Sequence, residues 1–426
     1  MSTTDILLSL AAARDLPEEA RATARLSLYD WMVCGLAGVE EPVSQAVRGY
    51  LAAEGGAGVA AVMGAGRLPA RAAAMANGAT SHALDYDDTH FAHVGHLSVG
   101  VYPAALAAGE EAGATAAEVV DAFLVGAEAA IRVGLHLGGG HYDRGFHQTA
   151  TAGAFGATVA AARLYGLSEG QTRAALGLCA TRASGLKNQF GTMGKPLNAG
   201  IAAANGVECA GLARAGLTSA DDGIAGAQGF VATHADAPEP GAALSERFLF
   251  PDIRFKLHAC CHGTHAMIEG LRGIAPAEVR ALSLRTSPRW LSVCDIKRPR
   301  TGLEVKFSYG WLAAMVLTGV PTSSDRAYTD ALAADPRLAE IAARVTVTGD
   351  ATVGDMQAVG EVTLADGTVR PFAHDLAAPI PHWVLAASLR AKGQALLGAR
   401  GETLWQAVDG IDALSARDLG ALVVAG

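Results

Sequence analysis

Titratable and nucleophilic side chains gather in four short segments of this 426-residue sequence, and the first segment is the densest. The segment ALDYDDTHFAHVGHLS contains three aspartates and three histidines. Its HxxHxxH spacing brings His90, His93 and His96 within reach of one another, which is one way to bind zinc. Zinc sites usually draw their ligands from distant segments, however, and the HExxH pattern is absent. We therefore predict no metal site here, and a polar, histidine-rich loop that faces a pocket.

The second segment, HLGGGHYDRGFHQTATAG, places a run of three glycines before a predicted helix. Consecutive glycines allow close backbone approach and unusual dihedral angles. Tyr142, Arg144 and His147 follow them, and the first helical turn is small and polar. Such a helix N-terminus can receive a carboxylate, although an N-capping loop with exposed polar residues would look the same. We favour a functional role for these three side chains.

In the third segment, GTMGKPLNAGIAAANG, the functional interpretation rests on one residue, Lys195, which directly precedes Pro196. Proline favours the first position of a helix, so we predict that the helix begins at Pro196. A lysine at that end faces the positive pole of the helix dipole among small, apolar neighbours. Both effects favour the neutral amine and predict a lowered pKa for Lys195. A lysine in this position can act as a general base or bind a carboxylate.

The fourth segment, FKLHACCHGTHAMIEG, combines an ammonium, thiols and imidazoles near a predicted helix start. It contains Lys256, His258, Cys260, Cys261, His262 and His265. No second cysteine pair follows at zinc-finger spacing, so acid–base or anion-binding roles fit better than a zinc site. Phosphate-binding and nucleotide-binding glycine motifs and the G-x-S-x-G motif are absent, which argues against nucleotide-dependent and serine-hydrolase chemistry.

Composition narrows the class of partner. The chain has 33 basic and 42 acidic residues, a net charge of −9 and no long basic run, so nucleic acid and anionic membranes are poor partners. The charge-free window over residues 90–109 contains three histidines and a proline, which does not suit a membrane span. The N-terminus is acidic where a secretory signal is basic, and the six cysteines have no regular spacing. We predict a soluble, cytoplasmic protein.

The elements that must position these segments are mostly helices. Helical patterning covers the first 235 residues, with Gly or Ala every three or four positions, and Pro17 is expected to open one helix. After the linker ADAPEPGA, the stretches EVRALSLRT, ARVTVTG and AVGEVTLADGTVRPF read as strands, with a hairpin at ADG. Helical patterning returns at about Pro381. We predict a mainly α fold, with an all-helical domain of residues 1–244 and 381–426 and an α+β domain of residues 245–380.

In this order, the segments resemble the MmgE/PrpD family, which includes 2-methylcitrate dehydratase, cis-aconitate decarboxylase and iminodisuccinate epimerase. The matching segments are ALDYDDTHFAHVGHLS, GFHQTATAGAFGA, GTMGKPLNAGIAAANG, FKLHACCHGTHAMIEG and VKFSYGWLAAMVLTG. The resemblance implies a large helical domain completed by the C-terminus, a smaller α+β lid and a homodimer. It also implies cofactor-free chemistry on small di- or tricarboxylates in the cleft between the domains.

The resemblance carries particular residues into the site. Those that match the family segments are Asp85, Thr89, His96, His147, Lys195, Lys256 and His265.

Three departures bear on the branch of the family. Cys261, with His262 beside it, stands where the decarboxylases carry histidine, and His258-Ala259 replaces the usual Tyr-Pro. The chain is also shorter than the methylcitrate dehydratases. Length and lid motif favour the iminodisuccinate epimerase branch.

The chemistry implied is removal of a proton from a carbon next to a carboxylate. An epimerase needs two acid–base groups on opposite faces of that carbon, for which we predict Lys195 and Tyr142. His96, His147 and His262 are alternative catalytic groups. The expected substrate-binding residues are Asp85, Thr89, Arg144, Lys256, Cys261 and His265.

The first reading is thus an epimerase of an aspartate-derived dicarboxylate such as iminodisuccinate. The alternative is a dehydratase or decarboxylase of a citrate-like tricarboxylate. A metallohydrolase that uses the HxxHxxH group and a non-catalytic helical scaffold stay open outside the family.

Overall fold

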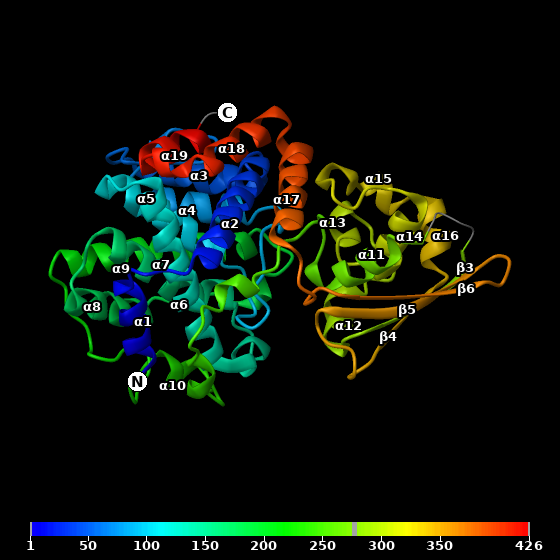
Figure 1. The fold of residues 1–426 in the computed structure, drawn as a ribbon, viewed down its shortest axis with the longest axis horizontal. Helices are drawn as coiled ribbons and strands as arrows, with labels where there is room; N and C mark the ends of the chain where they lie inside the picture. The colour runs from blue at the N-terminus through cyan, green and yellow to red at the C-terminus, as the bar shows by residue number, and fades with distance from the viewer. Residues whose placement is uncertain (1, 275–278, 425–426) are drawn as a thin grey trace. The chain divides into compact units, whose positions relative to one another are not determined.

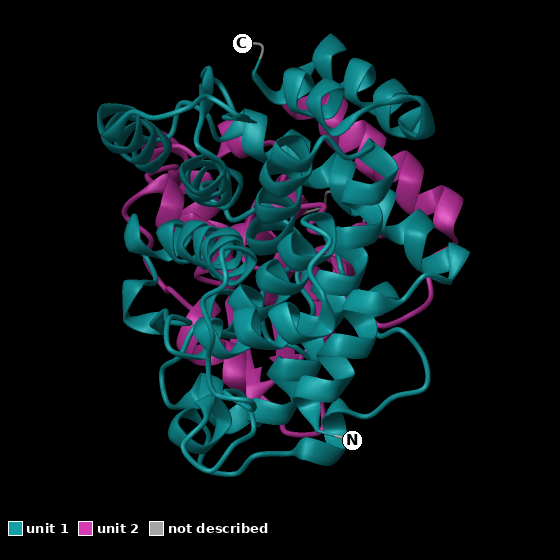
Figure 2. Cartoon of the chain, turned by 90° about the vertical axis from the view of Figure 1, so that its left-hand side faces the viewer, with its two compact units in different colours: residues 1–255, 397–426 teal, residues 256–396 magenta. Residues whose placement is uncertain are grey.

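The computed structural model describes residues 2–274 and 279–424, and the chain forms two compact units. Residues 1–255 and 397–426 form the first, which we call the helical unit, and residues 256–396 form the second, the α+β unit (Figures 1 and 2). The mainly α fold predicted from the sequence is confirmed. The predicted domain limits stay a prediction, and they include residues 1, 275–278 and 425–426, which lie outside the described residues.

The helical unit is built from helices and one short two-stranded ribbon. Its helices are α1 (Thr3–Ala12), α2 (Glu18–Ala37), α3 (Pro42–Glu54), α4 (Ala70–Ser81), α5 (Ser98–Ala112), α6 (Ala116–Asp143), α7 (Gln148–Leu164), α8 (Glu169–Ala180), α9 (Gly194–Arg214), α10 (Phe230–His234), α18 (Ala399–Asp409) and α19 (Ala416–Val424). The ribbon pairs β1 (Ala60–Ala61) with β2 (Arg67–Leu68). Pro17, expected as the first helical residue of α2, is its N-cap, in an extended conformation.

Glycines at helix crossings bring backbones of the helical unit into direct contact. A Cβ atom added at Gly126 of α6 would lie 2.6 Å from the carbonyl oxygen of Gly156 on α7. One added at Gly78 of α4 would lie 2.7 Å from the Cα of Gly200 on α9. The small-residue spacing of the sequence therefore produces the close helix packing that it predicts. These crossings fix α4, α7 and α9, whose ends carry the site residues.

The α+β unit contains a four-stranded sheet in the order β4-β3-β5-β6. The strands are β3 (Val279–Thr286), β4 (Val345–Gly349), β5 (Gln357–Leu364) and β6 (Val369–Asp375). Leu284 of β3 pairs with Val347 of β4 in parallel and with Gly360 of β5 in antiparallel register. The predicted hairpin joins β5 to β6, and Gly367 in its turn has a φ of 84°. Glu278, at the start of the predicted first strand, lies outside the described residues.

The helices of this unit are α11 (His265–Leu271), α12 (Pro288–Cys294), α13 (Gly302–Val305), α14 (Tyr309–Thr318), α15 (Asp330–Ala333), α16 (Pro336–Ala342) and α17 (His382–Leu397), whose last residue falls in the helical unit. Apart from α17, they have ten residues or fewer. Helix α11 packs on β5 and β6, where the ring of Phe372 lies against Gly270. Across residues 2–274 and 279–424, no helix combines the length and the apolar character that crossing a membrane would require.

Candidate active site

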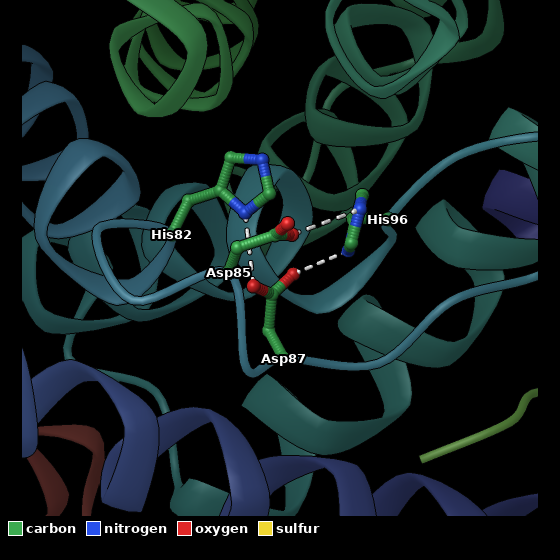
Figure 3. A group of neighbouring side chains, drawn as sticks. All are labelled: His82, Asp85, Asp87 and His96. Carbon is green, nitrogen blue, oxygen red and sulfur yellow. Dashed lines mark hydrogen bonds and ion pairs between the residues drawn. The ribbon is translucent and has the colours of Figure 1, made fainter. Parts of the chain in front are cut away.

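The loop between α4 and α5 carries most of the site. His82 is the C-cap of α4, and Asp85, Asp87 and His96 follow it before α5 begins (Figure 3). Asp85 has a φ of 52°, in the left-handed region that aspartate tolerates better than most residues. With Lys195 from α9, these four side chains form a group that we call the site cluster.

Lys195 and His96 both lie beside one oxygen of Asp85. The Lys195 Nζ is 2.7 Å from Asp85 Oδ1, and the His96 Nε2 is 3.7 Å from the same oxygen. Helix α9 begins at Gly194, two residues before the predicted start, so Lys195 lies within its first turn. The helix dipole and burial both act on the Lys195 amine, and the structure adds a carboxylate partner that the local sequence does not reveal.

Asp87 lies between two imidazoles and is fully buried. Its Oδ1 is 2.9 Å from His82 Nδ1, and its Oδ2 is 2.7 Å from His96 Nδ1 (Figure 3). Burial raises the pKa of Asp87, but His82 and His96 outweigh burial and hold that pKa well below its usual range. Burial lowers the pKa of His82 to about 4 despite the neighbouring Asp87, so His82 is neutral at neutral pH.

His147 completes the polar surroundings of the cluster. It is the N-cap residue of α7, and its ring lies 6.2 Å from that of His82. The Asn198 side-chain amide of α9 donates to His147 Nδ1 over 3.1 Å, which leaves the proton of the neutral ring on Nε2. Burial, followed by the positive charge of nearby groups including Lys195, lowers the pKa of His147 well below its usual value. The Phe190 ring packs edge-on against His147 at 5.0 Å.

The HxxHxxH spacing does not bring its three histidines together. The His90 Nε2 is 3.0 Å from the Leu249 carbonyl oxygen, and its Nδ1 accepts from the His93 backbone N–H. The His93 ring packs against Gly95 and Gly134. Burial lowers the pKa of His90 to about 4 and that of His93 to about 3. His90 and His93 are thus neutral core residues, and His96 alone of the three belongs to the site cluster.

The side chains that come closest to forming a metal site are not the three histidines of the HxxHxxH motif. Ligand atoms of His82, Asp85, Asp87 and His96 lie within 4.8 Å of one another. A cation there would compete with the Lys195 ammonium for Asp85 and with two imidazoles for Asp87. Lys195 already neutralises Asp85, and both oxygens of Asp87 already face imidazole nitrogens, so this arrangement fits proton transfer and anion binding better than metal binding.

Thr89, also expected in the site, is fixed by its backbone. Its N–H donates to the Arg254 carbonyl, and its own carbonyl accepts from the Arg254 N–H, each over 2.8 Å. The Thr89 hydroxyl is buried, and no hydrogen-bond partner is found for it among the described residues.

Tyr142 and Arg144 make their described contacts elsewhere. The Lys187 Nζ lies 3.6 Å from the centre of the Tyr142 ring and donates to the Tyr142 carbonyl over 2.9 Å. Arg144 forms an exposed 2.6 Å ion pair with Asp236. Of the three consecutive glycines before them, Gly138 departs from helical geometry, with a φ of 71°. The predicted roles of Tyr142 and Arg144 stay predictions.

The α+β unit holds a second group of imidazoles. His265 lies 4.5 Å from His262 and 4.9 Å from His258, measured between ring centres. His258 Nε2 is 2.7 Å from Glu269 Oε1, and its Nδ1 is 2.8 Å from the Thr322 hydroxyl. Burial lowers the pKa of His265 well below its usual value.

The other expected residues of this unit neighbour these histidines. Lys256 is buried, and its carbonyl accepts from Lys392 Nζ over 3.0 Å. The Cys261 backbone N–H donates to the Lys306 carbonyl. Burial raises the pKa of neighbouring Cys260 to about 12, which keeps it as a thiol at neutral pH.

Sequence reasoning missed four side chains of the helical-unit site. Asp87 lies in the first motif but was not selected, because three neighbouring aspartates look alike in sequence. His82 directly precedes that motif and reads as the end of a helix. Asn198 lies one helical turn after Lys195, a spacing that could have placed both on one helix face. Phe190 lies in a loop where nothing local points to His147.

Comparison with known proteins gives two family matches and several relatives. The MmgE/PrpD N-terminal domain matches residues 8–243, and the MmgE/PrpD C-terminal domain matches residues 258–387. The chain is 32% identical to a cis-aconitate decarboxylase of Aspergillus terreus over 72% of this chain and 69% of that protein. It is 32% identical to the cis-aconitate decarboxylase-like protein oryM of Aspergillus oryzae, over 60% of this chain and 58% of that protein. The human cis-aconitate decarboxylase is 34% identical over 35% of this chain and 32% of its own length.

Proposed function

Since the chain belongs to the MmgE/PrpD family, we propose that it is a carboxy-lyase that acts on a small tricarboxylate of the cis-aconitate type. Relatives named as cis-aconitate decarboxylases at 32% identity support this choice over the epimerase expected from the sequence. The observation that carries the proposal is the approach of Lys195 and His96 to one oxygen of Asp85. An ammonium and an imidazole therefore meet beside one carboxylate oxygen.

Decarboxylation of an unsaturated tricarboxylate sets three demands. The C–C bond to one carboxylate breaks and CO₂ leaves, while the electron pair of that bond forms a new double bond. The electrons of the former double bond take a proton at the carbon beside another carboxylate. The site must hold carboxylates, stabilise the charge that moves toward them, and deliver one proton.

The helical-unit site contains groups suited to each demand. In this proposal the Lys195 ammonium binds a substrate carboxylate and delivers the proton, with Asp85 as its counter-ion. His147, with its proton on Nε2, donates to a second carboxylate. The buried Thr89 hydroxyl is a further donor in the same loop. Fixed donors in a site that excludes water stabilise developing charge more strongly than the same groups in water.

An epimerase would share part of this chemistry with a decarboxylase. Removal of a proton beside a carboxylate also needs a base and a bound carboxylate, so the site cluster alone does not separate the reactions. The relatives described above carry decarboxylase names, and none of those three carries an epimerase name. A dehydratase would need an acid that protonates a leaving hydroxyl.

The decisive experiment offers the protein separate di- and tricarboxylates in deuterium oxide. Proton NMR should show that cis-aconitate loses one carboxylate and that the product gains one deuterium at the newly protonated carbon. An alkene formed from a citrate-type hydroxy acid would replace the proposal with a dehydratase. Deuterium exchange with inversion of iminodisuccinate, without loss of CO₂, would replace it with the epimerase.

The assembly and location of the protein form a separate part of the proposal. The homodimer implied by the family resemblance and the cytoplasmic location expected from the sequence stay predictions. Light scattering on the purified chain checks the first, and fractionation of the source cells checks the second.

A further inference from the structure

We propose that Asp87, anchored by His82, is the positioning residue of this site: it holds His96 in the tautomer with its proton on Nδ1 and directs Nε2 toward Asp85. The inference rests on the proposed function for its kinetic consequence only. The geometry that supports it comes from the site cluster itself (Figure 3).

The two oxygens of Asp87 each face one imidazole nitrogen. Oδ1 is 2.9 Å from His82 Nδ1, and Oδ2 is 2.7 Å from His96 Nδ1. The His82 contact is a hydrogen bond, whereas the His96 contact is a close ion-pair approach in which neither Oδ2 nor His96 Nδ1 has an aligned hydrogen-bond partner among the described residues. An ionised carboxylate can only accept hydrogen bonds, so a hydrogen on His96 Nδ1 turns a repulsive approach into an attractive one. In a neutral imidazole the other nitrogen then lacks a proton. For His96 this nitrogen is Nε2, which lies 3.7 Å from Asp85 Oδ1.

The surroundings keep Asp87 ionised and His82 neutral. Burial opposes ionisation of Asp87, but the two imidazoles hold its pKa well below the usual range. Burial lowers the pKa of His82 to about 4. His82 therefore donates from Nδ1 without adding a full positive charge, and Asp87 has a fixed orientation when His96 changes its protonation.

A carboxylate behind an imidazole serves acid–base catalysis by selecting the tautomer and the ring orientation. His96 Nε2 faces the same Asp85 oxygen that Lys195 contacts. After the Lys195 ammonium has given its proton to the substrate carbon, the neutral amine must regain one. With its lone pair on that side, His96 Nε2 can take a proton from solvent and return it to Lys195. Asp87 acts through His96 in this arrangement.

The neighbouring Asp88 provides a matched control. It is also fully buried, but its carboxylate accepts from the backbone N–H groups of Leu97 and Ser98 and from the Ser98 hydroxyl. In Asp88→Asn, the amide oxygen can still accept from both N–H groups, and the amide nitrogen can donate to the hydroxyl. The change therefore conserves the structural contacts at the start of α5.

Asp87→Asn has a different consequence for its two partners. The amide oxygen can still accept from His82, but the amide nitrogen would then face His96 Nδ1 and donate to it. This forces the His96 proton to Nε2. The expected result is a switch of the His96 tautomer and a loss in kcat of about 100-fold or more. KM for cis-aconitate should change by less than about threefold, because ground-state binding is unchanged.

The test combines ¹⁵N NMR of histidine-labelled protein at a pH of about 8 with steady-state kinetics. The His96 signals are assigned by their absence from the His96→Gln spectrum. Wild type and Asp88→Asn should both show a protonated Nδ1 and a deprotonated Nε2 in His96, and Asp87→Asn should show the reverse. Asp88→Asn should retain kcat within about threefold.

Three results would overturn the inference. They are a proton on His96 Nε2 in the wild type, an unchanged tautomer in Asp87→Asn, and an equal loss of kcat in Asp88→Asn. If Asp87→Asn does not fold, the wild-type spectrum decides alone. If the wild type converts no carboxylate, the proposed function fails, while the tautomer still decides the role of Asp87.

Discussion

The Lys195 ammonium lies 2.7 Å from the Asp85 carboxylate, although one residue lies in the first turn of α9 and the other follows α4. Their side chains are 15% and 24% exposed, so the ion pair is partly shielded from water. The pair therefore gives the site a cation with a fixed position. It also makes each partner necessary for the other, because either alone would be a poorly solvated charge.

Replacement of Lys195 by alanine should lower kcat/KM by about 100-fold or more, the typical contribution of a general acid or base. Asp85 would lose its cation, so the free energy of unfolding should also fall, by about 1–2 kcal/mol for a partly buried pair. Steady-state kinetics and urea unfolding measure the two effects. Lys195→Arg is the control that retains the charge, and near-normal turnover in Lys195→Ala would remove the residue from the mechanism.

Acid should destabilise the helical unit between pH 6.5 and 4. His82 and His90 have folded pKa values of about 4 and His93 of about 3, all below the unfolded value of about 6.5. The unfolded chain then binds more protons in this range, so stability is present above pH 6.5 and is lost as pH falls. Asp88 acts in the opposite direction, because burial raises its pKa to about 6, and it gains stability on acidification.

The stability lost through the three histidines should exceed the stability gained through Asp88, because each histidine pKa shift corresponds to an upper limit of about 3–5 kcal/mol. We expect a net loss of several kcal/mol in the free energy of unfolding between pH 6.5 and 4, measured by urea unfolding. His90→Gln should flatten this pH dependence, and Asp88→Asn should steepen it between pH 4 and 6. A stability independent of pH over this range would contradict the neutral, buried state of the histidines.

Gly200→Ala should separate α4 from α9. The added methyl group would lie within 3.2 Å of the Ala79 backbone nitrogen and still closer to the Met75 carbonyl oxygen, neither of which can move aside. We expect a loss of about 1–3 kcal/mol in stability and a lower kcat, because Lys195 would move away from Asp85. Thermal unfolding and kinetics measure both.

Gly211→Ala is the matched control on the same helix. Among the described residues, no atom outside the helix lies within 4 Å of its added methyl group, so helix propensity should raise stability by about 0.5–1 kcal/mol. Equal effects of the two substitutions would show that contact between α4 and α9 is unimportant.

Tyr142→Phe separates the proposed lyase from the epimerase. The ring would still lie beneath Lys187, and circular dichroism and thermal unfolding would establish that the variant is folded. A lyase that uses Lys195 as its acid should retain kcat within about threefold. Loss of inversion on iminodisuccinate, with continued exchange of deuterium, would instead assign Tyr142 to one face of an epimerase.

Local sequence predicted the elements better than the contacts between them. The helices, the β5–β6 hairpin and the position of Lys195 near the start of a helix follow from capping, periodicity and turn residues. The partner of Lys195 could not be predicted from physical rules, because Asp85, Asp87 and Asp88 are equivalent until the left-handed φ of Asp85 turns it toward α9. Family resemblance selected Asp85 but not Asp87, which has no distinguishing local signal.

The histidines also show that local sequence does not predict which side chains lie together. The regular spacing of His90, His93 and His96 suggested a shared task, yet two of them fill the core, and His82, outside the pattern, joins the site cluster. Spacing in a loop fixes separation along the chain but not direction. The backbone pairing of His90 with Gly95 and of Thr89 with Arg254 sets that direction.

The contact between Gly78 and Gly200 has a mechanical consequence. Where two helices contact each other through side chains, rotamer changes can accommodate a small displacement. Here backbone contacts backbone at Gly78 and Gly200, so side-chain rearrangement cannot accommodate it. We therefore expect a thermal shift of α9 to carry α4 with it. Lys195 and the loop that holds Asp85 are attached to these two helices, so this coupling would preserve the 2.7 Å distance between ammonium and carboxylate while the surrounding protein fluctuates.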